Sequence, residues 1–230
     1  MFFWLKIIDG VPDIKMKRPL DLFISDALEK KIKDNWDNFV KDKDDYWDGD
    51  LLAVTNYDSV NNVIELGRAK YSWLIYSSNN NDLDINSLFV SILLRTIDGY
   101  YVIIKNNHDK FNIIGGMVEE DDLESDKFNP DVCLRRELKE ELNLDLDNKN
   151  HISYYEVKYF KEPKPGNNYG IVYRGVLNFN KSDFISYFEK CKSKFDGEIS
   201  ELLLLNKNEV KLLDLSDGGI SYLSEMMEFE

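Results

Sequence analysis

Cysteine is scarce in this chain of 230 residues, and long apolar runs are absent. Cys133 and Cys191 are too few for a disulfide scaffold or a cysteine zinc site. No apolar run approaches the ~20 residues that a membrane span requires. The apolar opening of residues 1–5 is interrupted by Lys6 and Asp9, and no small-residue cleavage site follows, as a signal peptide would require. These absences predict a soluble cytoplasmic protein without a membrane partner.

Positive charge is also scarce. The chain has 29 Lys and Arg against 43 Asp and Glu, a formal net charge of -14. Such a surface repels the phosphate backbone of long nucleic acids, so we expect no partner of that kind. A small anionic substrate remains compatible with this charge if divalent cations bridge the protein and the ligand. A hydrophobic content of 43% and an aromatic content of 13% exclude a disordered acidic protein.

The hydrophobic periodicity predicts a mixture of helices and strands, which is typical of an α/β or α+β protein. A chain of this length forms one large domain or a domain with an extension. The polar run at residues 79–82 is the best internal boundary, and it separates an N-terminal extension (1–86) from a core (87–230). The pattern leaves residues 71–76 open between helix and strand, and Asp98-Gly99 predicts a hairpin. Helices are expected at residues 25–40, 130–142 and 181–192 and near the C-terminus, and strands at 51–57, 62–66, 88–95, 100–105, 152–160, 169–179 and 201–205.

The helix expected at residues 130–142 concentrates carboxylates. Asn129 is a good N-cap and Pro130 suits the first helical position. At 100° per residue, one face carries an apolar stripe, and three glutamates lie on the adjacent arc instead of opposite it. The stripe consists of Leu134, Leu138 and Leu142, and the glutamates are Glu137, Glu140 and Glu141.

Three clustered carboxylates repel one another unless a counterion is present. Hard divalent cations such as Mg²⁺ or Mn²⁺ prefer these oxygen ligands, and they can clamp a diphosphate and activate a water molecule. The alternative interpretation is an acidic helix face exposed to solvent.

Residues 136–141 read Arg-Glu-Leu-Lys-Glu-Glu, and Gly115-Gly116 lies upstream after two expected strands. This arrangement resembles the signature of the Nudix hydrolases, over roughly residues 87–215. The resemblance implies an α/β/α sandwich with a mixed sheet, here with an N-terminal α+β extension. It also implies metal-dependent hydrolysis of a nucleoside diphosphate derivative. By this match Glu137, Glu140 and Glu141 would bind the metal, Arg136 would orient the carboxylates, and the Gly115 carbonyl could add a ligand.

The chain departs from the family's pattern at several points. About six additional residues lie between the double glycine and the helix, within residues 121–129. The glutamate that the family places before the helix appears as Asp122, or is displaced to Glu120 or Glu124. Asn143 replaces a glycine, and Ile114 stands where a proline is usual. Many members add a carboxylate from a late loop as ligand or general base, and Glu198 is the candidate here, with a plain exposed loop residue as the alternative.

The first 86 residues resemble, more weakly, the Nudix branch that hydrolyses UDP-glucose and UDP-galactose. That branch has an aromatic-Asn/Asp-Gly turn and a Leu-Gly-x-x-x-Tyr motif before its core, matched here by residues 47–49 and 66–71. The resemblance implies Tyr71 as a substrate contact, and Arg68 or Lys70 could meet a phosphate. Lys105 is a further candidate for substrate binding. The alternative is that Tyr71 is a core aromatic residue.

The best functional hypothesis is therefore a Mg²⁺-dependent or Mn²⁺-dependent pyrophosphohydrolase that cleaves a UDP-sugar to UMP and sugar phosphate. ADP-ribose or another nucleoside diphosphate derivative is the alternative substrate. A nucleotide-binding Nudix module without catalysis and a purely structural interaction protein are rivals, and the net charge disfavours mRNA-cap hydrolysis. The sequence leaves open the base, the sugar and the choice between monomer and homodimer.

Overall fold

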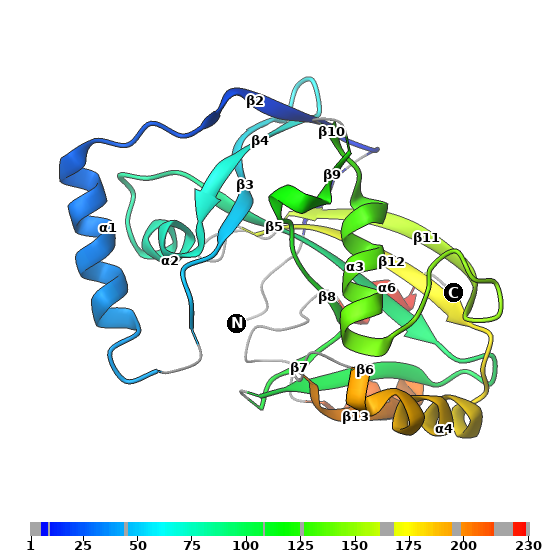
Figure 1. The fold of residues 1–230 in the computed structure, drawn as a ribbon. Helices are drawn as coiled ribbons and strands as arrows, with labels where there is room; N and C mark the ends of the chain where they lie inside the picture. The colour runs from blue at the N-terminus through cyan, green and yellow to red at the C-terminus, as the bar shows by residue number, and fades with distance from the viewer. Residues whose placement is uncertain are drawn as a thin grey trace.

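The computed structural model describes residues 6–8, 10–43, 46–107, 109–124, 127–161, 168–194, 199–213 and 223–228. Its centre is a large mixed sheet (Figure 1). β12 pairs with β5 in parallel and β2 with β4 in parallel, whereas the other pairs along this path are antiparallel. The strand order is β1 (Lys6–Ile7), β11 (Ile152–Lys161), β12 (Tyr169–Leu177), β5 (Asn86–Arg95), β3 (Asp50–Asp58), β4 (Val63–Lys70) and β2 (Asp13–Asp21).

Further strands branch from β5. β8 (Ile114–Met117) pairs with β5 antiparallel, and β6 (Tyr101–Asn106) pairs with β7 (Phe111–Asn112) and with β13 (Ile199–Leu205). At Asp98-Gly99 the expected hairpin is reduced to a turn. β5 and β6 share one register pair there, Arg95 with Tyr101, because β6 pairs along its length with β13. A separate ribbon joins β9 (Leu123–Glu124) to β10 (Lys127–Phe128).

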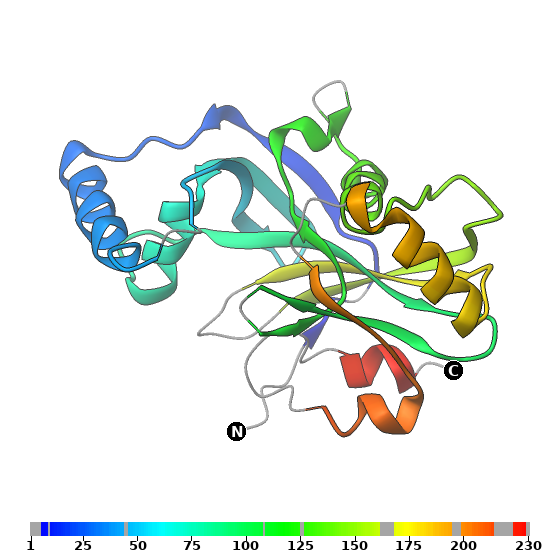
Figure 2. The same cartoon turned by 60° about the horizontal axis from the view of Figure 1, so that its bottom comes forward.

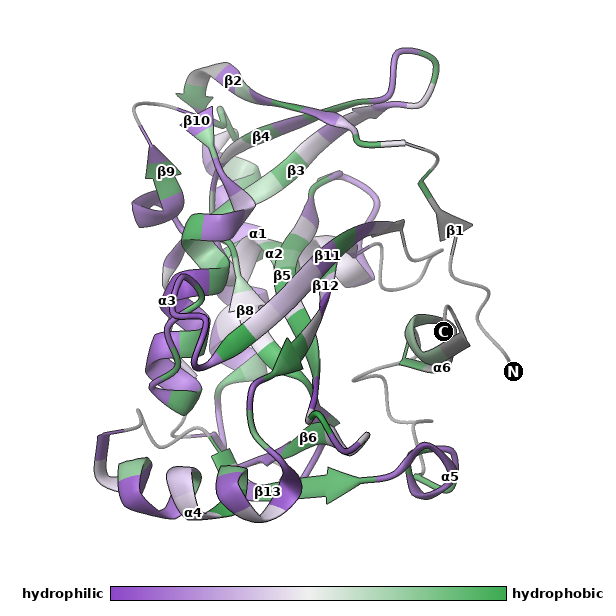
Figure 3. Ribbon diagram, turned by 90° about the vertical axis from the view of Figure 1, so that its right-hand side faces the viewer, coloured by the Kyte–Doolittle hydropathy of each residue, from purple (hydrophilic) through white to green (hydrophobic). Residues whose placement is uncertain are grey.

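Helices cover both faces of the sheet. α3 (Pro130–Leu142) lies on one side of β11 and β12, and α6 (Leu223–Glu228) lies on the other (Figure 3). Alternate residues of β5 and β12 face the two sides, as expected for strands: Ile92 and Ile171 belong to the apolar cluster beneath α3, whereas Leu93 and Val172 belong to the cluster beneath α6. α4 (Lys181–Cys191) contributes to the first cluster. The expected mixed α/β class is confirmed.

The N-terminal helices pack at one end of the sheet, away from α4, α5 (Lys207–Val210) and α6 (Figure 2). α1 (Asp26–Phe39) begins as expected, because the Ser25 hydroxyl accepts a hydrogen bond from the Leu28 N–H. Residues 71–79, which the pattern left open, form α2 (Tyr71–Asn79). α2 packs on β3 and β4 through a third apolar cluster that includes Leu51, Ala69 and Leu74.

The residues on either side of position 86 belong to the same sheet. β3 pairs with the start of β5 at Ala53–Ser87 and Val54–Asn86. The Leu52 N–H also donates to the Val118 carbonyl, at 2.9 Å, just after β8. The extension is therefore joined by hydrogen bonds to the strand that carries Gly115-Gly116. None of the helices that the structure describes combines the length and the apolar character needed to pass through a bilayer.

Candidate active site

The carboxylate helix forms as its sequence predicts. The Asn129 side chain accepts a hydrogen bond from the Asp131 N–H at 3.1 Å and caps α3. At the other end Asn143 is left-handed, with φ of 51°, so it fills the place of a helix-ending glycine. The three leucines of the stripe are fully buried. The neighbouring face of α3, which carries Glu137 and Glu141, is therefore held close to the sheet.

The double glycine allows β8 to approach this face closely. A Cβ atom at Gly116 would lie 2.3 Å from Glu137 Oε1, so any other residue there would displace the Glu137 carboxylate. At Gly115 a Cβ would lie 2.3 Å from the Val90 carbonyl, and its φ of +142° is one that other residues rarely adopt. The Gly115 N–H donates to Glu141 Oε2 at 3.1 Å. Both glycines are thus needed to seat two carboxylates on the strand.

Two of the three glutamates are buried. Glu137 is 7% exposed and Glu141 is 4% exposed, whereas Glu140 is exposed. Ionised carboxylates are rarely buried without a compensating charge, because desolvation is costly. Of the three glutamates expected to converge beside the core, Glu137 and Glu141 are buried there, whereas Glu140 is exposed to solvent.

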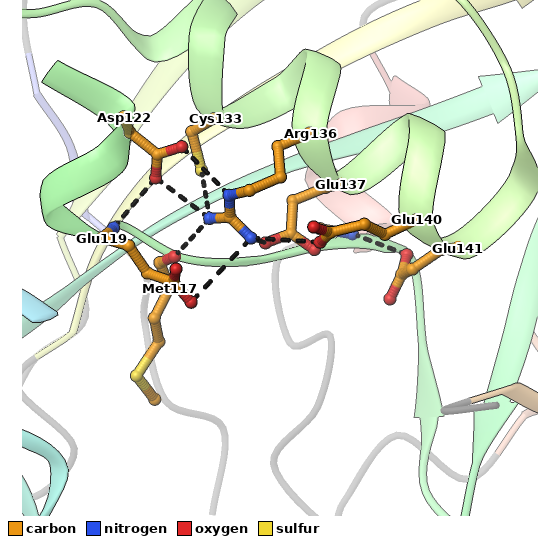
Figure 4. Close-up of polar contacts among 9 residues, drawn as sticks. Met117, Glu119, Asp122, Cys133, Arg136, Glu137, Glu140 and Glu141 are labelled. Carbon is orange, nitrogen blue, oxygen red and sulfur yellow. Dashed lines mark hydrogen bonds and ion pairs between the residues drawn. The ribbon is translucent and has the colours of Figure 1, made fainter. Parts of the chain in front are cut away.

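Arg136 lies among these acids (Figure 4). Its guanidinium donates to Glu137 at 2.7 Å and to Glu140 at 3.3 Å, both through Nη1. Nη2 donates to the Met117 carbonyl at 3.1 Å, which ties the helix to the end of β8. Arg136 therefore contacts two of the three glutamates directly.

Asp122, one of the acids before the helix, contacts Arg136. It lies at the end of a short 3₁₀ helix, η1 (Glu120–Asp122), is 1% exposed, and accepts hydrogen bonds from Arg136 at 3.1 and 3.0 Å. Burial acts to lower the pKa of Arg136, but the carboxylates of Asp122 and Glu137 outweigh it, and the pKa is raised. Glu124 instead accepts from the Asn129 side chain at 2.7 Å. Of the three positions that the sequence left open, Asp122 thus occupies the place beside the arginine.

The donor chemistry of the site suits a hard divalent cation. Glu137 and Glu141 offer carboxylate oxygens, the ligands that Mg²⁺ and Mn²⁺ prefer, on the same side of α3. Among the residues that the structure describes, no three His, Cys, Asp or Glu side chains are grouped closely enough to hold a metal ion. Glu140 is instead within 3.3 Å of Arg136.

The other predicted site residues lie outside this cluster. Tyr71 opens α2 and packs against Trp36 and Tyr46, with ring centroids 5.9 and 6.4 Å away. Burial raises the pKa of Tyr71. Lys105 in β6 forms an ion pair with Asp109 at 2.8 Å.

Arg68 in β4 is bonded to two acids. It contacts Glu120 of η1 and Asp21 of β2, so a substrate phosphate would have to compete with these carboxylates. Lys70, the alternative, lies 3.9 Å from Asp50. Glu198, the proposed late carboxylate, lies outside the described residues.

A polar pocket of about 480 Å³ adjoins the end of β8. Tyr71 lines it together with Met117, whose carbonyl accepts from Arg136. Tyr71 thus lies in a cavity whose described lining includes none of Glu137, Glu140 and Glu141. No motif in the sequence marks Met117 or Asn86 as residues that line a pocket. Strand pairing between β8 and β5 brings their segments together.

No family model and no curated protein match the chain. Several solved structures resemble it at low identity. DR0079 from Deinococcus radiodurans is 16% identical over 69% of this chain and 85% of its own, with a TM-score of 0.41. A NUDIX hydrolase from Nitrosomonas europaea is 15% identical over 55% and 76%, with a TM-score of 0.35.

A third is a bifunctional NMN adenylyltransferase/ADP ribose pyrophosphatase from Francisella tularensis, complexed with AMP and a Mn ion. It is 16% identical over 64% of this chain but only 42% of its own length, with a TM-score of 0.42. Scores of this size do not establish a shared fold or a shared activity. The chemistry of the site must carry the functional conclusion.

Proposed function

We propose that this protein is a divalent-metal-dependent pyrophosphohydrolase that acts on a nucleoside diphosphate derivative. The observation that carries this proposal is the seating of two buried carboxylates, Glu137 and Glu141, on the backbone of Gly115-Gly116. Arg136 is a single positive charge within ion-pair distance of four acids, Glu119, Asp122, Glu137 and Glu140. The cluster has an excess of negative charge, which a divalent cation would offset.

Glu137, Glu140 and Glu141 would hold Mg²⁺ or Mn²⁺, and the Gly115 carbonyl would add an oxygen ligand. The metal would supply Lewis acidity at the phosphate and an activated water. Arg136 orients Glu137 and Glu140 through the contacts described above, and Asp122 holds Arg136 in place. Glu198 is our candidate for an additional catalytic carboxylate.

For the substrate we propose a UDP-sugar, cleaved to UMP and sugar phosphate, with ADP-ribose or another nucleoside diphosphate derivative as the alternative. Residues 1–86 would form an extension that helps bind the substrate, and residues 87–230 the catalytic core. The position of Tyr71 in the pocket beside Met117 supports a substrate contact for this residue. Lys105 remains a proposed substrate contact. The protein would act either as a monomer or as a homodimer.

The test is hydrolysis of a nucleotide panel with Mg²⁺ by the wild type, Glu141→Gln and the control Glu189→Gln. Glu189 is exposed on α4, so the same change there should leave turnover intact. Gln keeps an acceptor for the Gly115 N–H, so we expect Glu141→Gln to fold. Turnover should fall at least about 100-fold, because even changes to groups outside the ligand shell commonly cost 10–100-fold.

The panel contains UDP-glucose, UDP-galactose, ADP-ribose, a dinucleoside polyphosphate and 8-oxo-dGTP, with products separated by chromatography. Release of UMP from the UDP-sugars, lost in Glu141→Gln, would support the proposed substrate. Cleavage of another member alone would keep the hydrolase and discard the UDP-sugar. No cleavage with Mg²⁺ or Mn²⁺, despite nucleotide binding, would favour the binding module.

A further inference from the structure

Lys43 follows the end of α1, and its ammonium group lies against aromatic rings instead of an acid. Its Nζ is 3.5 Å from the centre of the Phe39 ring and 5.1 Å from that of the Tyr46 ring. Cation–π attraction acts within about 6 Å of a ring centroid, so both rings attract this charge. The chain holds 43 acidic residues, yet no carboxylate among the described residues forms an ion pair with Lys43.

The two rings form an aromatic corner, a name used here for the surface made by Phe39 and Tyr46. Their centroids are 5.1 Å apart and their planes are inclined by 79°. Trp36 stacks on Phe39 at 5.6 Å, and Tyr71 stacks on Tyr46 at 6.4 Å. Trp36 and Tyr71 also meet edge to face at 5.9 Å, so each of the four rings contacts two others. The aromatic corner is therefore held by ring packing and does not need Lys43 to form.

A ligand can reach the aromatic corner from solvent. Lys43 is exposed, and Phe39 and Tyr46 are only half-buried. A lysine ammonium is strongly hydrated and lies on a flexible stem, so Lys43 can leave the rings and recover its contacts with water. Residues 41–45 contain three aspartates and two lysines within a chain of net charge -14, so an approaching cation is attracted.

We infer that the aromatic corner binds a quaternary ammonium group, and that Lys43 occupies the site as an intramolecular substitute for this ligand. A quaternary ammonium has no N–H to donate to water, so it loses less hydration than a lysine when it moves onto the rings. Aromatic faces are the surfaces that commonly recognise such cations in proteins. Choline and a trimethylated lysine side chain both present this group. Either would exchange with Lys43 at the same two rings.

This site is separate from the proposed hydrolase site. α1 lies at one end of the molecule, on the far side of α2 from α3 (Figure 1). The described lining of the pocket beside β8 includes Tyr71 but neither Phe39 nor Tyr46. Binding at the aromatic corner therefore goes beyond the proposed function and can be measured without metal or nucleotide.

The test is a titration with choline, with trimethyllysine and with dimethylbutanol, the neutral isostere of choline in which carbon replaces the charged nitrogen. Binding is followed by proton NMR of the methyl groups, whose signals move upfield over an aromatic face. The proteins are the wild type, Lys43→Gln, Phe39→Leu and the control Lys41→Gln. Lys41 is exposed two residues before Lys43, so its substitution removes the same charge away from the rings. Melting temperatures verify that each variant is folded.

At least one of the two cations should bind the wild type and Lys41→Gln alike. Lys43→Gln should bind it about two- to fivefold more tightly, because the competing cation–π contact of the lysine is gone. Phe39→Leu should weaken binding, and dimethylbutanol should bind more weakly than choline to every folded variant. Binding of choline alone would assign the site to a small molecule, and binding of trimethyllysine alone to a methylated protein side chain.

The inference is overturned if neither cation binds Lys43→Gln, or if dimethylbutanol binds as tightly as choline. It is also overturned if folded Phe39→Leu binds as the wild type does. Equal affinities of Lys43→Gln and the wild type, or the same gain in Lys41→Gln, would reject Lys43 as the occupant. If Phe39→Leu does not fold, the comparison of Lys43→Gln with Lys41→Gln and of choline with its isostere still decides the matter.

Discussion

Arg68 of β4 donates two hydrogen bonds to Glu120 of η1, 2.9 Å from Nε to Oε2 and 2.5 Å from Nη2 to Oε1. Asp21 of β2 contacts the same guanidinium. The three residues of η1 include Asp122, which binds Arg136, which in turn binds Glu137. The N-terminal extension is thus linked to a proposed metal ligand through three arginine–carboxylate contacts and one short helix.

This relationship makes Arg68 a positioning residue. Arg68→Met removes the hydrogen bonds between β4 and η1. Asp122 should then restrict the positions of Arg136 and Glu137 less. We expect turnover to fall about 10-fold, as for other supporting residues around metal sites, and half-saturation to require more Mg²⁺. The measurement is turnover against Mg²⁺ concentration, at saturating substrate.

Arg135→Met is the matched control, because Arg135 is ion-paired to Asp147 at 2.9 Å on the same helix as Arg136. It should leave the Mg²⁺ dependence unchanged. If Arg68 contacts a substrate phosphate instead, Arg68→Met would raise KM and leave the Mg²⁺ half-saturation at its wild-type value.

Gly116→Ala should impair activity through one contact. The added Cβ would lie 2.3 Å from Glu137 Oε1, so either the carboxylate or β8 must move. We expect loss of most hydrolysis, measured as kcat with Mg²⁺, in a protein that retains a cooperative unfolding transition.

Gly99→Ala is the control for backbone effects. Gly99 has φ of +90° and open space around its Cβ position, so alanine there should cost about 1–2 kcal/mol of stability through strain alone. Its kcat should equal that of the wild type. Equal kcat values for the two alanine variants and the wild type would contradict the seating of Glu137 on Gly116.

Stability should fall at alkaline pH. Burial, and then the hydrogen bond from the Tyr173 hydroxyl to Asp131 at 2.7 Å, raise the pKa of Tyr173, and burial raises the pKa of the Cys133 thiol. The folded state therefore holds both protons more tightly than the unfolded state. This contribution is complete below the unfolded pKa values of about 8.5 for cysteine and 10 for tyrosine, and it is lost as pH rises through the higher folded values.

Urea unfolding between pH 7.5 and 11 tests this expectation. The free energy of unfolding should decrease above about pH 9, with each such group adding up to about 1.4 kcal/mol per pH unit. Tyr173→Phe should be less stable at pH 7.5 but should lose less stability between pH 10 and 11. An identical pH slope in this variant would show that Tyr173 is not the titrating group.

The sequence by itself determined the site helix. Asn129, Pro130 and the leucine stripe are local signals, because capping and helical periodicity act within a few residues. They predict the bounds of α3, which the structure confirms, and of the three glutamates expected beside the core, Glu137 and Glu141 are buried there. The same locality explains why α1 and most strands were predictable.

Tertiary structure decided what depends on distant partners. α2 is apolar without a clear period, and it becomes a helix that packs on β3 and β4. β2 was not predicted, because its charged sequence is stabilised by pairing with β4, some fifty residues later. Arg68 and Asp122 are separated from their partners in the same way. Residue spacing determines a helix face, but only sheet register brings β4, η1 and β8 around it.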